Sequence, residues 1–125
     1  MNPLVSVIVP IYNAAPFLKE TLDSIIASTY RPIEIVMVDD GSQDNSLNIA
    51  QDYCTYHPDC VVIAQANQGV SAARNKAIQS AQGTYILPVD ADDKIGDTFI
   101  QQAVEVMEKN DNIRVVGCRC WMFGA

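Results

Sequence analysis

Hydrophobic residues recur along this chain in two alternating patterns. Short runs of β-branched and other apolar residues predict five strands, over Leu4–Pro10, Ile33–Val38, Val61–Ala66, Thr84–Val89 and Ile113–Cys118. Apolar residues at helical spacing predict four helices between them, over Pro16–Ser28, Asp44–Tyr53, Val70–Ala81 and Asp97–Lys109. Apolar strands that alternate with helices are typical of a parallel sheet covered on both faces. We therefore expect an α/β fold, with a mainly parallel open sheet in a three-layer α/β/α arrangement.

Acidic residues follow two of the predicted strands directly. Asp39 and Asp40 end one strand, and Asp90, Asp92 and Asp93 follow another. We expect these strands to be neighbours whose carboxyl ends converge on one crevice, where open α/β sheets bind ligands. In an extended segment Asp90 and Asp92 would point the same way and Asp93 away. Such a pair suits Mg²⁺ or Mn²⁺; a solvated acidic turn is the plainer interpretation.

Composition and charge narrow the function classes. The chain has 125 residues, enough for one domain, with 49% hydrophobic and 18% charged residues, which is a globular composition. A net charge of −7 argues against nucleic-acid binding, which needs a basic face. No apolar stretch is long enough to span a membrane, and the start of the chain lacks the basic region of a signal peptide. We expect a cytoplasmic protein, at most peripheral to the inner face of the membrane.

The cysteines are expected to be free thiols in a reducing compartment. They are Cys54, Cys60, Cys118 and Cys120. Cys54, His57 and Cys60 could form part of a metal site, but their spacing matches no common zinc pattern.

Four motifs carry a resemblance to a known family. They are Val5-Ser-Val-Ile-Val-Pro-Ile-Tyr-Asn, Val38-Asp-Asp-Gly-Ser-Gln-Asp, Asn67-Gln-Gly-Val-Ser-Ala-Ala-Arg-Asn and Val89-Asp-Ala-Asp-Asp. In this order and spacing the chain resembles the nucleotide-sugar-binding half of family-2 inverting glycosyltransferases of the GT-A fold. The resemblance implies one domain over residues 1–125 that binds a nucleotide-diphospho-sugar, usually UDP-linked, with Mn²⁺ or Mg²⁺. It also implies a saccharide or lipid-linked acceptor and a place in cell-envelope polysaccharide biosynthesis.

The resemblance assigns residues to the nucleotide. Pro10, Ile11 and Tyr12 match the loop that packs on the base, where an aromatic side chain is a suitable platform. Asp40 matches the carboxylate that accepts the uracil imide N–H, and Asn67 matches the turn before the third helix.

The resemblance also assigns residues to the diphosphate and the metal. Arg74 matches an arginine that reaches the base or the acidic motif; a helix-surface ion pair is the alternative. Asp90 matches the first aspartate of the motif, near the ribose or the outer sphere of the metal, and Ala91 beside it is assigned to the nucleotide. Asp92 matches the metal ligand, and Asp93 has the weakest match.

The family's catalytic base lies in the second half of the domain, beyond the segment that this chain matches. We therefore assign no catalytic residue here, and expect the chain to be truncated at its C-terminus and inactive alone. A nucleotidyltransferase and a catalytically silent nucleotide-binding module remain alternatives. The loop Pro10–Pro16 lacks the glycines expected of a nucleotidyltransferase or a dinucleotide-binding dehydrogenase.

Overall fold

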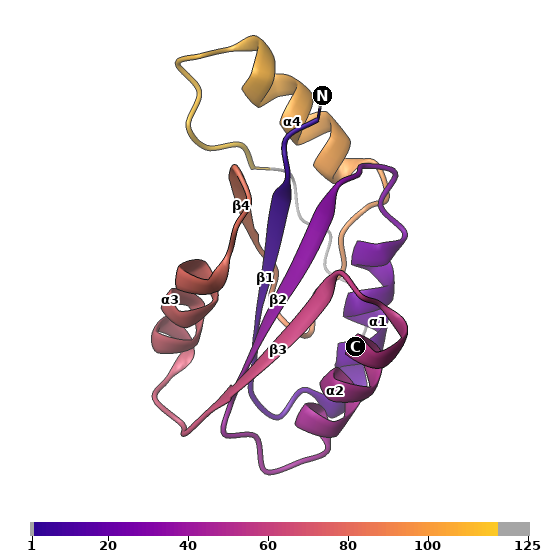
Figure 1. The fold of residues 1–125 in the computed structure, drawn as a ribbon, viewed down its shortest axis with the longest axis vertical. Coiled ribbons are helices and arrows are strands. Elements are labelled where there is room, and N and C mark those ends of the chain that lie inside the picture. Colours follow the sequence, from indigo (N-terminus) through magenta and orange to yellow (C-terminus); the bar gives the residue numbers. More distant parts are fainter. Residues whose placement is uncertain (1, 118–125) are drawn as a thin grey trace.

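The computed structural model describes residues 2–117, which form a four-stranded sheet with helices on both faces (Figure 1). The strands are β1 (Val5–Ile11), β2 (Ile33–Asp40), β3 (Cys60–Gln65) and β4 (Tyr85–Pro88). The helices are α1 (Ala15–Ile26), α2 (Ser46–Tyr56), α3 (Val70–Ser80) and α4 (Phe99–Lys109). Within this part of the chain, no helix is long and apolar enough to cross a membrane.

The sheet is parallel, with the strand order β3-β2-β1-β4. Val5 at the start of β1 pairs with Ile33 of β2 on one side and with Tyr85 of β4 on the other. The carboxyl ends of all four strands therefore lie at the same edge of the sheet. The α/β fold class and the parallel open sheet are confirmed. The two strands that end in acids are not neighbours, however, because β1 lies between β2 and β4.

Two hydrophobic clusters hold the helices against the sheet. On one face, side chains of β1 and β2 pack with α1, α2 and α4, and Leu18, Leu22 and Ile25 of α1 are fully buried. Burying one such side chain contributes about 1.5–3 kcal/mol. On the other face, α3 packs on β1 and β2 through Ala73 and Ala77, which are also fully buried. Figure 1 shows α3 on the side of the sheet opposite α1 and α2. The small alanine side chains let α3 lie close to the sheet, so its first turn stands beside the ends of β1 and β2.

The described residues 113–117 form no regular element, so the prediction of a strand over residues 113–118 is wrong for this part of the chain. Arg114, Val115 and Val116 instead line an apolar pocket of about 530 Å³ together with β4 and α4. The β-branched composition suits a strand, but composition does not supply the neighbouring strand that a ladder requires. Cys118 and Cys120 lie outside the described residues.

Candidate functional site

Two adjacent pockets open at the carboxyl edge of the sheet. The smaller, of about 180 Å³, lies between the ends of β1 and β2 and the first turn of α3. The larger, of about 270 Å³, lies between the end of β1, the start of α1 and the turn after β4. Pro10, Tyr12 and Val70 line both pockets. We call them the Asp40 pocket and the acidic pocket.

Asp40 is the charged residue of the first pocket, and its carboxylate is held by three donors. Oδ1 accepts hydrogen bonds from the Gln68 backbone N–H at 2.8 Å and from Gln65 Nε2 at 3.0 Å. Oδ2 accepts one from the Gly69 backbone N–H at 2.9 Å. Burial raises the pKa of Asp40, but these hydrogen bonds outweigh it and hold the pKa below the ordinary value. The carboxylate is therefore ionised at neutral pH.

Two glycines make this arrangement possible. Gly41 has a φ of +73°, and a Cβ there would lie 2.8 Å from the Asn67 backbone nitrogen. The contact lets Asn67 Nδ2 donate to the carbonyl of Asp40 at 3.1 Å. Gly69 has a φ of +101°, a conformation that turns its N–H toward the Asp40 carboxylate. The loops after β2 and β3 are thus locked together around Asp40. The side-chain amide of Asn67 is therefore used to join the two loops, through its hydrogen bond to the Asp40 carbonyl.

Tyr12 forms the wall between the two pockets, with 49% of its surface exposed. The next residue, Asn13, has a φ of +50° and is bonded on both sides to the loop after β2. Its N–H donates to Ser42 Oγ at 3.0 Å, and its Oδ1 accepts the Gln43 N–H at 2.8 Å. The buried Ser46 Oγ accepts the Ala14 N–H at 2.8 Å. These bonds fix the backbone that carries the exposed ring.

The neighbouring carboxylate, Asp39, points to the opposite face of the sheet and supports the same loop. It is 2% exposed, and its Oδ2 accepts the Ser42 N–H at 3.1 Å. Successive side chains along β2 point to opposite faces of the sheet, so Asp40 but not Asp39 reaches the pocket beside α3. Asp39 therefore supports the loop after β2.

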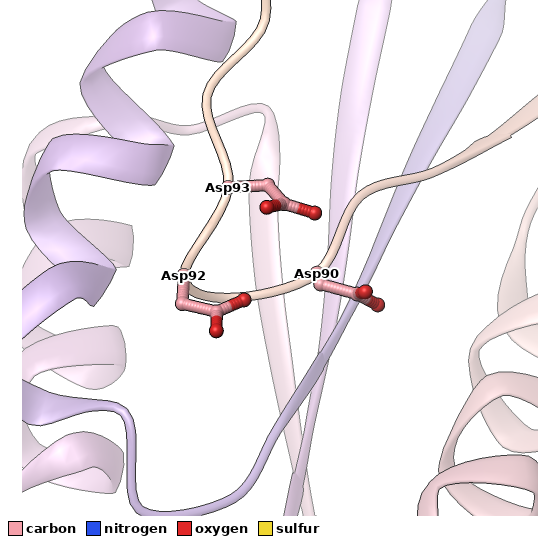
Figure 2. A group of neighbouring side chains, drawn as sticks. All are labelled: Asp90, Asp92 and Asp93. Carbon is pink, nitrogen blue, oxygen red and sulfur yellow. The ribbon is translucent and has the colours of Figure 1, made fainter. Parts of the chain in front are cut away.

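The three aspartates after β4 lie on a tight turn, which we call the acidic turn (Figure 2). The Asp93 N–H donates to the Asp90 carbonyl at 3.0 Å and closes the turn. One carboxylate oxygen from each of Asp90, Asp92 and Asp93 lies within 4.8 Å of the others. The expectation that Asp93 points away is wrong, because it assumed an extended backbone where the chain turns. Figure 2 shows the side chains of Asp92 and Asp93 both extending toward Asp90.

The electrostatics of the acidic turn favour a cation. Partial burial, together with the negative charges of Asp92 and Asp90, raises the pKa of Asp93. Three exposed oxygen ligands fit a hard divalent ion such as Mg²⁺ or Mn²⁺, which keeps several waters and takes phosphate oxygens. Among the described residues, no other group of three acidic, histidine or cysteine side chains comes this close. His57 stacks on Tyr53 at 4.2 Å between ring centroids.

Arg74 connects α3 to the acidic turn. Its Nη2 donates to Asp90 Oδ1 at 3.0 Å, and both side chains are about half exposed. The guanidinium therefore lies in the acidic pocket, beside the carboxylates, and could contact a phosphate there.

The pockets bring together the residues singled out in the sequence. The Asp40 pocket is lined by Pro10, Ile11, Tyr12, Asp40 and Asn67, and the acidic pocket by Pro10, Tyr12, Arg74, Asp90, Ala91 and Asp92. Ile11 is 1% exposed and belongs mainly to the core. Sequence reasoning missed Val70 and Phe17, which are 52% and 51% exposed in these pockets. Both residues are apolar and lie in the first turn of a helix that follows a sheet strand. That position could have indicated that they line a pocket at the carboxyl edge of the sheet.

Comparison with known proteins identifies the family. Residues 6–123 match the model of glycosyl transferase family 2. An uncharacterized glycosyltransferase of Bacillus subtilis, EpsJ, is 47% identical over 94% of this chain and 34% of its own length. The chondroitin synthase of Escherichia coli is 31% identical over 91% of this chain and 17% of its own length.

Two solved structures are similar. Staphylococcus aureus TarS in complex with UDP-GlcNAc has a TM-score of 0.80 and 29% identity, over 94% of this chain and 37% of its own. The mannosyltransferase PcManGT of Pyrobaculum calidifontis in complex with GDP-Man and Mn²⁺ has a TM-score of 0.79 and 31% identity, over 86% of this chain and 33% of its own. The chain thus spans about a third of the length of most of these relatives. With the family model matching nearly all of its residues, the chain belongs to glycosyl transferase family 2.

Proposed function

We propose that this chain forms the donor-binding part of an inverting glycosyltransferase. The donor is a nucleotide-diphospho-sugar, with UDP as the nucleotide, bound together with Mn²⁺ or Mg²⁺. The observation that carries the proposal is the pairing of two pockets at one sheet edge, one built on Asp40 and the other on the acidic turn, with Pro10 and Tyr12 between them. A nucleotide placed across Tyr12 would have its base in one pocket and its diphosphate in the other.

Asp40 is assigned to the base. An ionised carboxylate has about four acceptor sites, and the protein fills three of them. The remaining site would accept the imide N–H of uracil. Cytosine has no N–H at that position and would leave the site unfilled, so the carboxylate should discriminate between the two pyrimidines. The exposed ring of Tyr12 would stack on the base, and the Asn67 amide would keep Asp40 in place.

Asp92 and Asp90 are assigned to the metal, and Asp93, within reach of both, joins them as a third candidate ligand. Without a cation the diphosphate would face these carboxylates, and a like-charge pair about 4 Å apart costs up to about 4 kcal/mol at an effective dielectric near 20. When bound, the ion supplies positive charge that offsets the charge of the leaving diphosphate. Arg74 would hold a phosphate oxygen from the α3 side, and Ala91 would place its backbone beside the ribose.

The relatives support the donor class. TarS was solved with UDP-GlcNAc, and PcManGT with GDP-Man and Mn²⁺. Family membership disfavours a nucleotidyltransferase. For the whole protein we propose transfer to a hydroxyl of a saccharide or lipid-linked acceptor in cell-envelope polysaccharide synthesis. No residue of this chain is assigned to deprotonating that hydroxyl.

Calorimetric titration tests the proposal. UDP, GDP, dTDP and CDP are each titrated into the protein in Mn²⁺ and in EDTA. We expect UDP to bind in the presence of Mn²⁺ and to bind much more weakly in EDTA. In Mn²⁺, the affinity for UDP should exceed the affinity for CDP. Asp52→Asn, which removes an exposed carboxylate on α2, is the control and should bind as the parent does. UDP binding of equal strength in Mn²⁺ and EDTA would overturn the metal assignment, and equal binding of UDP and CDP the base assignment.

A further inference from the structure

The acidic turn is fastened to helix α1 by buried and half-buried side chains. Thr21, only 1% exposed, donates from Oγ1 to the carbonyl of Ala91 at 2.9 Å. One helical turn further on, Ser24 Oγ accepts the N–H of Ile95 at 3.2 Å. Helix α1 therefore holds the backbone at both ends of the segment that carries Asp92 and Asp93.

Two more contacts stiffen this attachment. Ser24 Oγ also donates to the Thr21 carbonyl at 2.7 Å, which fixes the serine hydroxyl within the helix. Glu20 forms an ion pair with Lys94 on the solvent side of the same segment. Glu20, Thr21 and Ser24 of α1 thus all contact the segment from Ala91 to Ile95.

The carbonyl that Thr21 binds belongs to the peptide plane between Ala91 and Asp92. Holding that oxygen fixes the orientation of the plane and hence the direction in which Asp92 leaves the backbone. The Ala91 side chain, 6% exposed, packs in the core on the same side. The hydrogen bond from the Asp93 N–H to the Asp90 carbonyl closes the turn from within.

We propose that Thr21, supported by Ser24, is a positioning residue that holds the acidic turn ready for a divalent cation. This inference rests on the metal-binding part of the proposed function. Thr21 does not touch the ion and acts through the Ala91 carbonyl. The three carboxylates repel one another, so an untethered turn would open when no cation is present. The tether keeps their oxygens within reach of one ion.

The proposal predicts an effect on ion selectivity as well as on affinity. Mg²⁺ demands nearly ideal octahedral geometry, whereas Ca²⁺ tolerates irregular arrangements and variable ligand numbers. Loosening the turn should therefore weaken Mg²⁺ and Mn²⁺ more than Ca²⁺. A loss of global stability alone would not change this ratio.

The test compares Thr21→Val, which keeps the branched shape but lacks the hydroxyl, with Thr21→Ser, which restores it. Binding of Mn²⁺ alone is measured by electron paramagnetic resonance of the free ion, and Mg²⁺ and Ca²⁺ are measured by competition. We expect Thr21→Val to lower Mn²⁺ affinity about tenfold, as loss of an outer hydrogen bond to a metal site typically does. Ca²⁺ should fall less, and Thr21→Ser should stay close to the parent.

Ser6→Ala is the matched control. Ser6 is also a fully buried hydroxyl, bonded to Glu34 at 2.6 Å near the start of β1, at the opposite edge of the sheet. The Ser6→Ala variant should lose thermal stability yet keep the parent's Mn²⁺ affinity. Should Thr21→Val not fold, Ser24→Ala carries the test, with reduced Mn²⁺ affinity expected.

The outcomes separate the inference from the proposed function. If the parent binds Mn²⁺ and Thr21→Val, or Ser24→Ala in its place, binds it equally well, the inference is wrong and the metal site stands. Equal losses in that variant and Ser6→Ala would also overturn it, because they would report stability alone. If the parent binds no Mn²⁺, the proposed metal site itself fails.

Discussion

Arg74 on α3 donates from Nη2 to Oδ1 of Asp90 at 3.0 Å, so one oxygen of the acidic turn is already engaged by a permanent positive charge. The same guanidinium that balances this carboxylate would compete with a metal ion for it. Once a diphosphate is bound, the Arg74 guanidinium could instead contact a phosphate oxygen as a second negative group. The ion pair therefore couples helix α3, which lines both pockets, to the acidic turn, where we propose the cation binds.

Replacing this arginine should move two affinities in opposite directions. In Arg74→Met, Mn²⁺ alone should bind more tightly because Asp90 loses its competitor, while UDP with Mn²⁺ should bind more weakly. Exposed ion pairs contribute about 0.2–1 kcal/mol, so we expect the Mn²⁺ gain to stay below about fivefold. Calorimetry measures both affinities. Lys76→Met removes the same charge from an exposed position of α3 and should change neither. Weaker Mn²⁺ binding in Arg74→Met would contradict competition at Asp90.

Neutralising Asp93 should stabilise the metal-free protein. The pKa of Asp93 is raised by partial burial and by repulsion from Asp92 and Asp90, and Asp93→Asn removes the charge that both disfavour. We expect a higher melting temperature in EDTA and a smaller further gain when Mn²⁺ is added, because one ligand is lost. Thermal denaturation with and without Mn²⁺ provides the measurement. Asp97→Asn, an exposed acid just beyond the turn, serves as the control. An unchanged gain from Mn²⁺ would show that Asp93 is no ligand.

The base assignment can be tested apart from the phosphates. Asp40→Asn replaces an acceptor by an amide that can no longer accept all three bonds from Gln65, Gln68 and Gly69, and unpairing a buried donor costs about 1–3 kcal/mol. UDP should therefore bind more weakly, and its preference over CDP should vanish. Magnesium pyrophosphate, which has no base, should bind nearly as before. A variant that still prefers UDP would remove Asp40 from the base subsite.

Asp40 should also leave a mark on acid stability. Its pKa in the fold is lower than the ordinary value of 3.8, so its ionised form stabilises the fold. That contribution is complete above the ordinary value and is lost as the pH falls through the lower folded value. The difference in unfolding free energy between the parent and Asp40→Asn should therefore stay constant at neutral and mildly acidic pH, and shrink only below about pH 4. Urea denaturation across pH measures it. A difference that fades on mild acidification would mean that the pKa is raised.

Local pattern predicted most of the fold, and its failures have physical causes. The strand expected over residues 33–38 continues to Asp40 in the structure, because Asp39 and Asp40 still pair with β3. Ending that strand at its last apolar residue ignored the sheet hydrogen bonds, which do not depend on side-chain polarity. The helix expected from Asp44 begins at Ser46, because Asp44 bonds to the Ser46 and Ala15 N–H groups instead.

The candidate site was harder to predict where long-range contacts decide the geometry. The alternating period of a strand misplaced Asp93, since the turn there is held by Thr21 and Ser24, about 70 positions earlier. Likewise, no local pattern indicated that β1 separates the two acidic strand ends. Residue types located the chemistry, whereas the relative placement of the groups depended on packing between distant segments.

The central position of β1 limits how this site could be re-engineered. Pro10 of β1 and the following Tyr12 line both pockets, so substitutions there would disturb the proposed cation and base subsites together. Gln65, at the far end of the Asp40 network, contacts the carboxylate without lining the acidic pocket. A library aimed at exchanging one donor nucleotide for another should therefore begin at the β3 side and leave the shared wall unchanged.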